Sequence, residues 1–362
     1  MKKDTIQSGA LDAIGDRCRA GVNISMGVGK TRLAIKHMIK RYTDISKFLV
    51  VAPKRSIFTS WIDELKSNPD YKFLEDHITF STYRSLAKQD TDYDIIYLDE
   101  CHSLKATHNE YLKEFVADGG TTIGLTGTYP SKATSEKGKM CNYYCPLVYT
   151  YTVDDAVDDN ILNDYRIYVH LLNLNDKGGL IKKGKYGEYE TAETKDYIYW
   201  SNQIAKAMDG RQQQMTRIMR MQALRTYRTK EKYANELFKS SNAKTIIFAN
   251  TQDQADRLCE YSVHSKNSKS DEHLQMFKDG FILKLSAVEQ LSEGVTIPEL
   301  KKGIIMHAYG NNRKASQKIG RLLRLNPNDE SEVIILCYAN TVDVEWTENA
   351  LKGFNQEKIT WL

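Results

Sequence analysis

Short apolar runs alternate along the chain with longer stretches in which apolar residues recur every three or four positions. In the first half the runs are 21–25, 47–52, 77–81, 94–98 and 121–125, and polar residues follow each of them. The second half repeats the pattern at 166–172, 244–249, 281–285, 303–309 and 331–338. Short continuous apolar runs are typical of parallel strands that helices cover on both faces. The pattern therefore predicts the α/β class, with two tandem domains that are each an open parallel sheet flanked by helices.

The domain boundary is predicted at 153–160, an acidic and polar stretch with the sequence VDDAVDDN. The first domain is expected to span 1–155 and the second 156–362, with a loop and helical insertion at about 174–240. The start of this insertion, at 174–190, is rich in Gly and Lys, which favours an exposed loop or hairpin tip.

Further along the insertion, residues 211–238 fit one amphipathic helix at about 100° per residue. Its two faces are an apolar one, expected to pack, and a basic one, which is either solvated or contacts phosphates. The apolar face comprises Met215, Met219, Ala223, Tyr227, Ala234, Leu237 and Phe238, and the basic stripe comprises Arg217, Arg220, Arg225, Arg228 and Lys232.

Composition adds few constraints. No apolar run approaches the roughly 18 residues of a membrane span, and the first residues lack the apolar core of a signal peptide. We therefore expect a soluble protein of the cytoplasm. Six scattered cysteines favour reduced thiols over a zinc site at Cys141 and Cys145. The net charge of +4 permits a polyanionic partner without requiring one.

A phosphate-binding loop is predicted immediately after the first apolar run, in the sequence MGVGKT at 26–31. Its glycines let the backbone N–H groups turn toward phosphate oxygens, and an amphipathic helix follows. Lys30 would supply a charge for the β- and γ-phosphates, and Thr31 a hydroxyl for Mg²⁺. The full pattern has glycine where this chain has Ile24, so a glycine-containing turn before a helix is the alternative. The predicted ATP-binding set is Gly27, Val28, Gly29, Lys30 and Thr31.

Two acids follow the apolar run at 94–98. Ligands of open α/β sheets bind beyond the carboxyl ends of the strands, which is where Asp99 and Glu100 are expected. Mg²⁺ prefers carboxylate oxygen and water, so Asp99 is predicted as its ligand. Glu100 is then placed to deprotonate an attacking water as a general base. A solvated pair of acids is the alternative for these residues taken alone. His102 is either a loop histidine or a link to the second domain.

Taken in order, these and further motifs resemble those of superfamily 2 DExH-type helicases and translocases. The matching stretches are TIQSGALDAI (5–14), VVAPKRSIFTSWIDEL (50–65), TYRSL (82–86), DECH (99–102), LTGTYP (125–130), SEGVTIPEL (292–300) and QKIGRLLR (317–324). The third of these stretches matches an element that contacts the nucleic-acid backbone, and the last matches its motif at every fixed position. Tyr129 is inserted before the proline of its motif, Thr296 stands where many relatives have an acid, and Val288 replaces a threonine. Phage UvsW-like branched-DNA helicases and chromatin-remodelling-type DNA translocases are the most similar groups.

The resemblance implies roles for residues outside the phosphate loop and the acids. Gln7 would bind adenine, Gly294 would contact ATP, and Thr126, Gly127 and Thr128 would couple the two sites. Nucleic-acid contacts are expected, mainly to backbone phosphates, from Pro53, Lys54, Arg55, Thr82, Tyr83, Arg84 and Thr296, together with His264 and Lys266 of the loop 263–270. The catalytic set would comprise Glu100, His102, Gln317, Arg321 and Arg324.

The two arginines lie three positions apart on a probable helix of the second domain, so both side chains point the same way. An arginine supplied from outside the phosphate loop can neutralise charge that develops on the γ-phosphate. The alternative is a helix with two solvated arginines.

These observations lead to one hypothesis and its rivals. We expect two RecA-like domains with ATP and Mg²⁺ in the cleft between them, and an ATP-dependent DNA helicase or translocase, with branched DNA as a candidate substrate. DNA is favoured over RNA as partner, and a monomer and a phage origin are expected. The rivals are an RNA helicase and an ATP-gated nucleic-acid clamp that does not move along its ligand.

Overall fold

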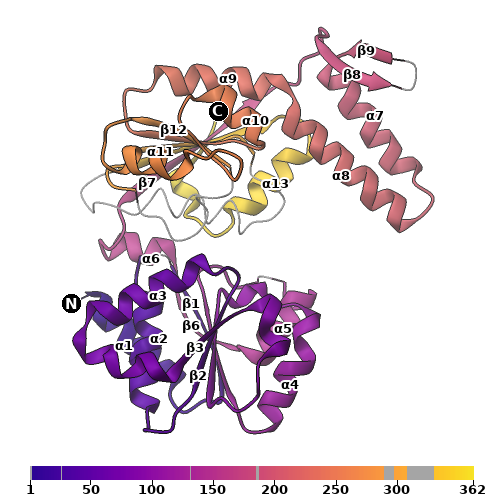
Figure 1. The fold of residues 1–362 in the computed structure, drawn as a ribbon. Coiled ribbons are helices and arrows are strands. Elements are labelled where there is room, and N and C mark those ends of the chain that lie inside the picture. The colour runs from indigo at the N-terminus through magenta and orange to yellow at the C-terminus, as the bar shows by residue number, and fades with distance from the viewer. Residues whose placement is uncertain (1, 26, 131, 185–186, 289–296, 308–329) are drawn as a thin grey trace. The chain divides into compact units, whose positions relative to one another are not determined.

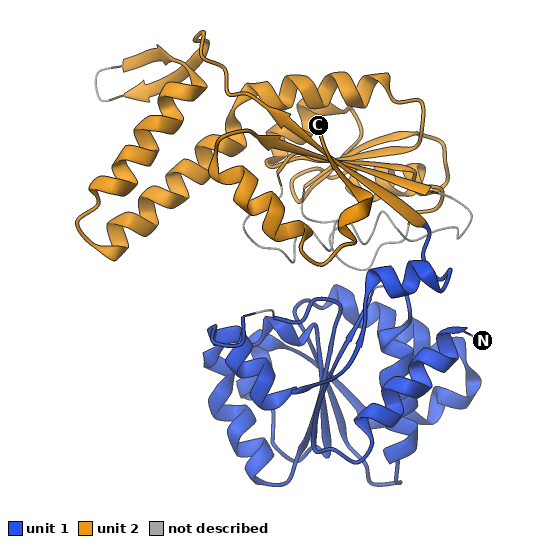
Figure 2. Cartoon of the chain, turned by 180° about the vertical axis from the view of Figure 1, so that it is seen from behind, with its two compact units in different colours: residues 1–163 blue, residues 164–362 orange. Residues whose placement is uncertain are grey.

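The computed structural model describes residues 2–25, 27–130, 132–184, 187–288, 297–307 and 330–362. The chain divides into two compact units, residues 1–163 and 164–362 (Figure 2). Each unit contains one large sheet in which every described strand pair is parallel. The predicted α/β class with two open parallel sheets is confirmed.

The first unit has a sheet in the order β3–β2–β4–β5–β1–β6. Helices α1, α2 and α3 cover one face of this sheet, and α4 and α5 cover the other (Figure 1). Because both faces are covered, β2 and β4 are buried at every position, which explains their unbroken apolar sequences. The elements are α1 Lys2–Ile14, β1 Arg19–Ile24, α2 Lys30–Arg41, β2 Phe48–Ala52, α3 Ser56–Ser67, β3 Ile78–Thr82, β4 Ile95–Asp99, α4 Asn109–Ala117, β5 Thr121–Thr126, α5 Glu136–Tyr144, β6 Leu147–Tyr151 and α6 Val153–Asp158.

The acidic stretch that suggested the domain boundary forms α6 and belongs to the first unit. The Tyr151 hydroxyl donates to the Asp155 carbonyl at 3.1 Å and to Asp159 Oδ2 at 2.7 Å. The ammonium group of Lys2, on α1, donates to the Asp159 carbonyl at 2.8 Å. These bonds tie α6 to the first unit, which ends at residue 163.

The second unit has a sheet in the order β11–β12–β10–β13–β14–β7–β15 and a separate antiparallel hairpin, β8–β9. Apolar residues of α9 and α10 form one core with β10, β13 and β14. The elements are β7 Asp164–Leu172, β8 Leu180–Gly184, β9 Gly187–Thr191, α7 Glu193–Lys206, α8 Gly210–Thr226, α9 Arg228–Ser240, β10 Thr245–Phe248, α10 Gln252–Leu258, β11 Ser262–Val263, α11 Ser270–Lys278, β12 Lys284–Ala287, β13 Lys302–Ile305, β14 Glu330–Tyr338, α13 Val342–Leu351 and β15 Ile359–Trp361.

The prediction of one helix over 211–238 is wrong. The backbone is extended at Tyr227, with φ −61° and ψ 140°, outside the helical region, and the chain divides there into α8 and α9. The basic stripe is consequently interrupted: Arg225 donates to the Asn250 carbonyl at 2.5 Å, and the Arg220 guanidinium lies over the Tyr197 ring. The break is stabilised by tertiary contacts, because the buried Tyr227 hydroxyl donates to Asp196 at 2.9 Å.

Strand predictions differ from the structure in two ways. The strand predicted at 281–285 begins later in the structure. Phe281 is 79% exposed, and β12 pairs with β10 only from Lys284 onward. Strands β6, β11 and β15 were not predicted, since β11 has two residues, β15 has three, and β6 is partly exposed at the sheet edge. Residues 180–184 and 187–191 form the two paired strands of a hairpin, which was one of the two expectations for this region. Among the described residues, none of the helices is both long and apolar enough to span a bilayer.

Candidate nucleotide site and nucleic-acid elements

The phosphate loop joins the end of β1 to the start of α2. Gly27 and Gly29 adopt φ angles of 89° and 95°, in the left-handed region that favours glycine. Helix α2 begins at Lys30, directly after Gly29, and the N–H of Leu33 donates to the Gly29 carbonyl at 3.0 Å. A helix N-terminus that follows such a turn presents unpaired N–H groups and a partial positive charge to an anion.

Gln7 supports this loop from α1. Its side chain is 2% exposed, and its amide Nε2 donates to the Val28 carbonyl at 2.9 Å. Its Oε1 is buried and makes no hydrogen bond to any of the residues that the structure describes. A buried acceptor without a donor costs free energy, so an N–H of a bound adenine is a fitting partner for it. Gln7, the predicted adenine-binding residue, therefore lies next to the loop. Its Nε2 already binds the loop backbone at Val28, which leaves Oε1 for a ligand.

Gly29→Ala should weaken ATP binding by about 10-fold. A Cβ at this position would lie 2.8 Å from Gln7 Nε2, and an L-residue at this φ costs about 1–2 kcal/mol, close to a tenfold change in affinity. Equilibrium titration with a fluorescent ATP analogue measures the change. Gly119→Ala is the matched control, because Gly119 has φ 90° but its Cβ would meet no atom within 4 Å. Equal affinities of the two variants for ATP would contradict the prediction.

Asp99 is the last residue of β4 and is 6% exposed. The Trp61 indole Nε1 donates to its Oδ2 at 2.9 Å, and the Glu100 N–H donates to its Oδ1 at 2.9 Å. Burial raises the pKa of Asp99 to about 6, and the neighbouring charge of Glu100 adds to this rise. A carboxylate kept from water beside a second acid is stabilised by a cation, so the site fits the predicted Mg²⁺, which Thr31 and Asp99 would hold.

Glu100 turns away from the strand, because its φ of 50° lies in the left-handed region. Its carboxylate lies 3.7 Å from Lys30 Nζ and 3.2 Å from His102 Nδ1. The same imidazole nitrogen is 2.8 Å from the Thr126 hydroxyl, which donates at 3.4 Å to Glu100 Oε2, the oxygen that His102 also contacts. The Thr128 N–H donates to the Thr126 hydroxyl at 3.0 Å. The structure thus joins the phosphate loop, DECH and the stretch around Gly127 in one polar cluster.

The predicted nucleic-acid elements of the first unit follow β2 and β3. Lys54 and Arg55 are exposed and Pro53 is partly buried, directly before α3. In the next element Arg84 is exposed and Thr82 partly buried, whereas Tyr83 is 6% exposed and its hydroxyl donates to the Asp99 carbonyl at 3.0 Å. Since β2 pairs in parallel with both β3 and β4, these elements lie at the same sheet edge as Asp99. The contact between Tyr83 and Asp99 was not predicted.

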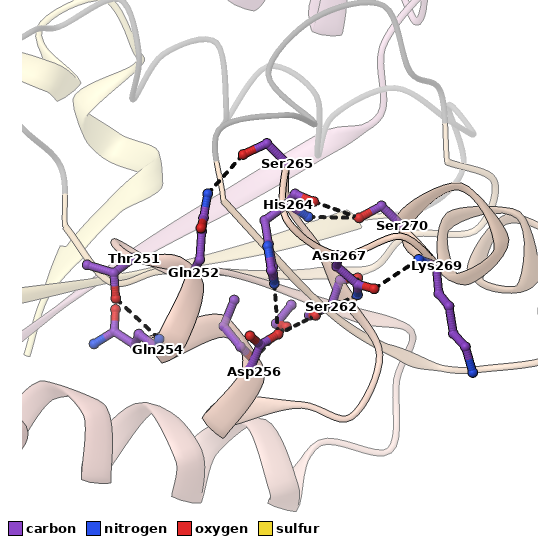
Figure 3. A network of polar contacts seen from close by, with 12 residues as sticks. Thr251, Gln252, Gln254, Asp256, Ser262, His264, Ser265, Asn267, Lys269 and Ser270 are labelled. Atoms are coloured by element: carbon purple, nitrogen blue, oxygen red, sulfur yellow. Dashed lines mark hydrogen bonds and ion pairs between the residues drawn. The ribbon is translucent and has the colours of Figure 1, made fainter.

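In the second unit, the loop 264–270 is closed by its own hydrogen bonds (Figure 3). The His264 N–H donates to the Ser270 hydroxyl at 3.1 Å, and that hydroxyl donates back to the His264 carbonyl at 2.9 Å. The His264 imidazole is 5% exposed and lies 2.8 Å from Asp256, whereas Lys266 is exposed. This burial favours a positioning role for His264 and leaves Lys266 as the candidate phosphate contact.

The remaining predicted site residues lie outside the described part of the chain. They are Gly294, Thr296, Gln317, Arg321 and Arg324. Trp61 is the site residue that the sequence analysis did not single out. The only available signal was a tryptophan in the helix after Lys54 and Arg55, and nothing in that signal indicated its contact with Asp99.

Two protein-family models match the chain in the order expected from the motifs. Type III restriction enzyme, res subunit, matches residues 4–131, and Helicase conserved C-terminal domain matches residues 229–326. The chain is therefore a superfamily 2 helicase, a class of ATP-dependent nucleic-acid helicases and translocases. Its fold matches the tandem RecA-like domains of this class, as predicted.

Individual relatives agree with this class. The DNA 3'-5' translocase XPB2 of Sulfurisphaera tokodaii is 25% identical over 367 residues, which cover 93% of this chain and 82% of that protein. Among solved structures, S. cerevisiae Dbp5 bound to RNA and ADP BeF3 matches 99% of this chain and 89% of its own, with TM-score 0.58 and 14% identity. The DNA-bound Type ISP restriction-modification enzyme LlaBIII matches 99% of this chain, with TM-score 0.63 and 13% identity, and this chain spans 31% of that enzyme. At these identities the two structures show the fold alone.

Proposed function

We propose that this protein is a DNA translocase or helicase that couples ATP hydrolysis to movement on DNA. The observation that carries the proposal is the contact among Lys30, Glu100, His102 and Thr126, which brings the phosphate loop, the proposed general base and the proposed coupling motif together. The relationship to a DNA 3'-5' translocase supports DNA over RNA as the partner. Branched DNA, suggested by the resemblance to UvsW-like helicases, is the substrate structure that we expect to be preferred.

In the proposed mechanism each residue has one task. Lys30 and the N–H groups at the start of α2 bind the phosphates, and Gln7 Oε1 accepts a hydrogen bond from adenine. Glu100 orients the attacking water and takes its proton. Thr31 and Asp99 would hold Mg²⁺, which would supply neutralisation of the phosphate charge. Arg321 and Arg324 are proposed from the sequence to add positive charge in the transition state.

On the nucleic-acid side, phosphates are the proposed ligands of Lys54, Arg55, Arg84 and Lys266, all of which are exposed. Contacts of this kind hold a backbone without selecting a base sequence, as movement along DNA requires. They also depend on ionic strength, because each one releases condensed counterions.

ATPase assays across nucleic-acid structures test the proposal directly. Forked or duplex DNA should stimulate hydrolysis at least several-fold more than RNA of the same length, and the stimulation should weaken with added salt. Lys30→Ala is the control that reports contaminating ATPase, since it should remove the activity. Stimulation by RNA alone would favour the RNA-helicase alternative, and no stimulation by any nucleic acid would reject the proposal.

Displacement of the third strand from a DNA triplex separates a motor from a clamp. A translocase displaces that strand in an ATP-dependent reaction, whereas a clamp binds DNA tightly with ATP and displaces nothing. We expect displacement by the native protein and none by Lys30→Ala.

A further inference from the structure

Asp99 is held from two different segments of the first unit. The Trp61 indole of α3 donates to its carboxylate at 2.9 Å, and the hydroxyl of Tyr83 donates to its backbone carbonyl at 3.0 Å. Both donors are buried, at 0% and 6% exposure. The carboxylate and the peptide of this acid are therefore oriented by groups that reach it through the core.

Each donor belongs to a segment that also carries exposed cations. Helix α3 continues without interruption from the turn before it, because Ile57 N–H donates to the Lys54 carbonyl at 3.2 Å and Phe58 N–H to the Arg55 carbonyl at 3.0 Å. Arg55 and Trp61 are consequently parts of one rigid element. Tyr83 directly precedes the exposed Arg84 in the chain.

The packing around these donors leaves little room for independent movement. The Trp61 ring lies 6.5 Å from that of Tyr97 in the core of the first unit, and Tyr83 packs in the apolar cluster that includes Leu98. In a close-packed interior, a shift of one group displaces its neighbours. A displacement of Arg55 or Arg84 would therefore also shift the hydrogen-bond donors of Asp99.

We propose that Trp61 and Tyr83 are positioning residues that transmit contact of nucleic acid with Lys54, Arg55 and Arg84 to the metal-binding acid Asp99. Nucleic acid on the exposed cations sets the position of both donors, and the donors set the orientation in which Asp99 meets its cation. The coupling to nucleic acid rests on the proposed function. The role of Trp61 in orienting Asp99 does not depend on it.

The test measures metal affinity directly, with Mn²⁺ as the paramagnetic probe and a non-hydrolysable ATP analogue present. Electron paramagnetic resonance counts free Mn²⁺ with and without duplex DNA, for the native chain, Trp61→Phe and Tyr83→Phe. The matched control is Tyr97→Phe, which removes a buried hydroxyl from the same aromatic core. That hydroxyl is bonded to His37 at 2.8 Å and not to Asp99.

We expect Trp61→Phe to raise the Kd for Mn²⁺ by about 10-fold, the size typical for loss of a hydrogen bond to a metal ligand. DNA should tighten Mn²⁺ binding several-fold in the native chain, and this tightening should be lost in Trp61→Phe and reduced in Tyr83→Phe. Tyr97→Phe should keep both the native Mn²⁺ affinity and the DNA effect.

Four results would decide against the inference, part of it or the function on which it rests. Native Mn²⁺ affinity in Trp61→Phe, or an equal loss in Tyr97→Phe, overturns the role of Trp61. A DNA effect that persists unchanged in both variants overturns the transmission. Absence of nucleic-acid-stimulated ATPase in the native chain rejects the proposed function instead, while Mn²⁺ affinity without DNA still decides the role of Trp61.

Discussion

Glu100→Gln should slow ATP hydrolysis by roughly 10²- to 10⁴-fold, the contribution typical of a general base. The carboxamide has nearly the shape of the carboxylate but takes no proton from water. Glu100 lies 3.7 Å from Lys30 and 3.2 Å from His102, so its carboxylate is at the phosphate loop rather than free in solvent. ATP binding should remain, because the loop and Gln7 are unchanged.

The measurement is kcat at saturating DNA, together with the Kd of an ATP analogue. Glu110→Gln is the matched control, since Glu110 is an exposed acid in the first turn of α4. It should retain the native kcat. A kcat of Glu100→Gln within threefold of the native value would mean that another group takes the proton.

Asp343→Asn should lower the free energy of unfolding of the second unit by about 3–5 kcal/mol. Asp343 is fully buried, where it pairs with the ammonium of Lys230, accepts from the Tyr338 N–H at 2.9 Å and lies 3.0 Å from His307 Nδ1. Burial lowers the pKa of His307, so the imidazole is neutral near pH 7 and Lys230 carries the counter-charge. The substitution leaves that ammonium buried without an opposite charge.

The pH dependence follows from the same cluster. Burial alone would raise the pKa of Asp343, but the ammonium of Lys230 and its contact with the His307 imidazole hold it well below its usual range. A carboxyl group with a lowered folded pKa stabilises the protein above its unfolded pKa, and this contribution is lost as pH falls through the folded value. The full effect of Asp343→Asn is therefore expected at neutral pH.

Urea unfolding of the full chain, followed by hydrogen exchange in peptides of each unit, measures this prediction. Glu332→Gln is the control: its salt bridge to Lys302 at 2.8 Å is partly exposed, so its loss should cost less than about 1 kcal/mol. The double substitution Lys230→Met, Asp343→Leu should cost less than Asp343→Asn, because no charge is left unpaired. Equal costs for Asp343→Asn and Glu332→Gln would show that the buried pair is not stabilising.

Features that are set by residues close together in the chain could be predicted from the sequence. The continuous apolar runs predicted β2, β4 and β14 because strands covered on both faces need apolar side chains at successive positions. The glycines at 27 and 29 predicted a turn before a helix, and both adopt the left-handed conformation that glycine favours. Asp99 and Glu100 were placed at a strand end for the same local reason.

Other features were decided by contacts between distant segments. The break at Tyr227 places its hydroxyl on Asp196, so the helical periodicity of 211–238 was overridden. Lys230 was expected on the helix that presents the basic stripe, yet its charge is buried against Asp343, 113 residues away. Periodicity describes which residues share a face of one element, and it carries no information about which charged group another element will place there.

The candidate site likewise contains some residues that could be predicted from the sequence and others that only the fold brings together. The residues of the phosphate loop are consecutive in the chain, and so are the two acids, so a role for each group could be predicted from the sequence. The groups that orient Asp99 are not consecutive: Trp61 and Tyr83 come from two other segments and meet it only because β2, β3 and β4 are parallel neighbours. Parallel pairing brings the carboxyl ends of strands to one edge of the sheet, and that long-range geometry is a property of the folded chain alone.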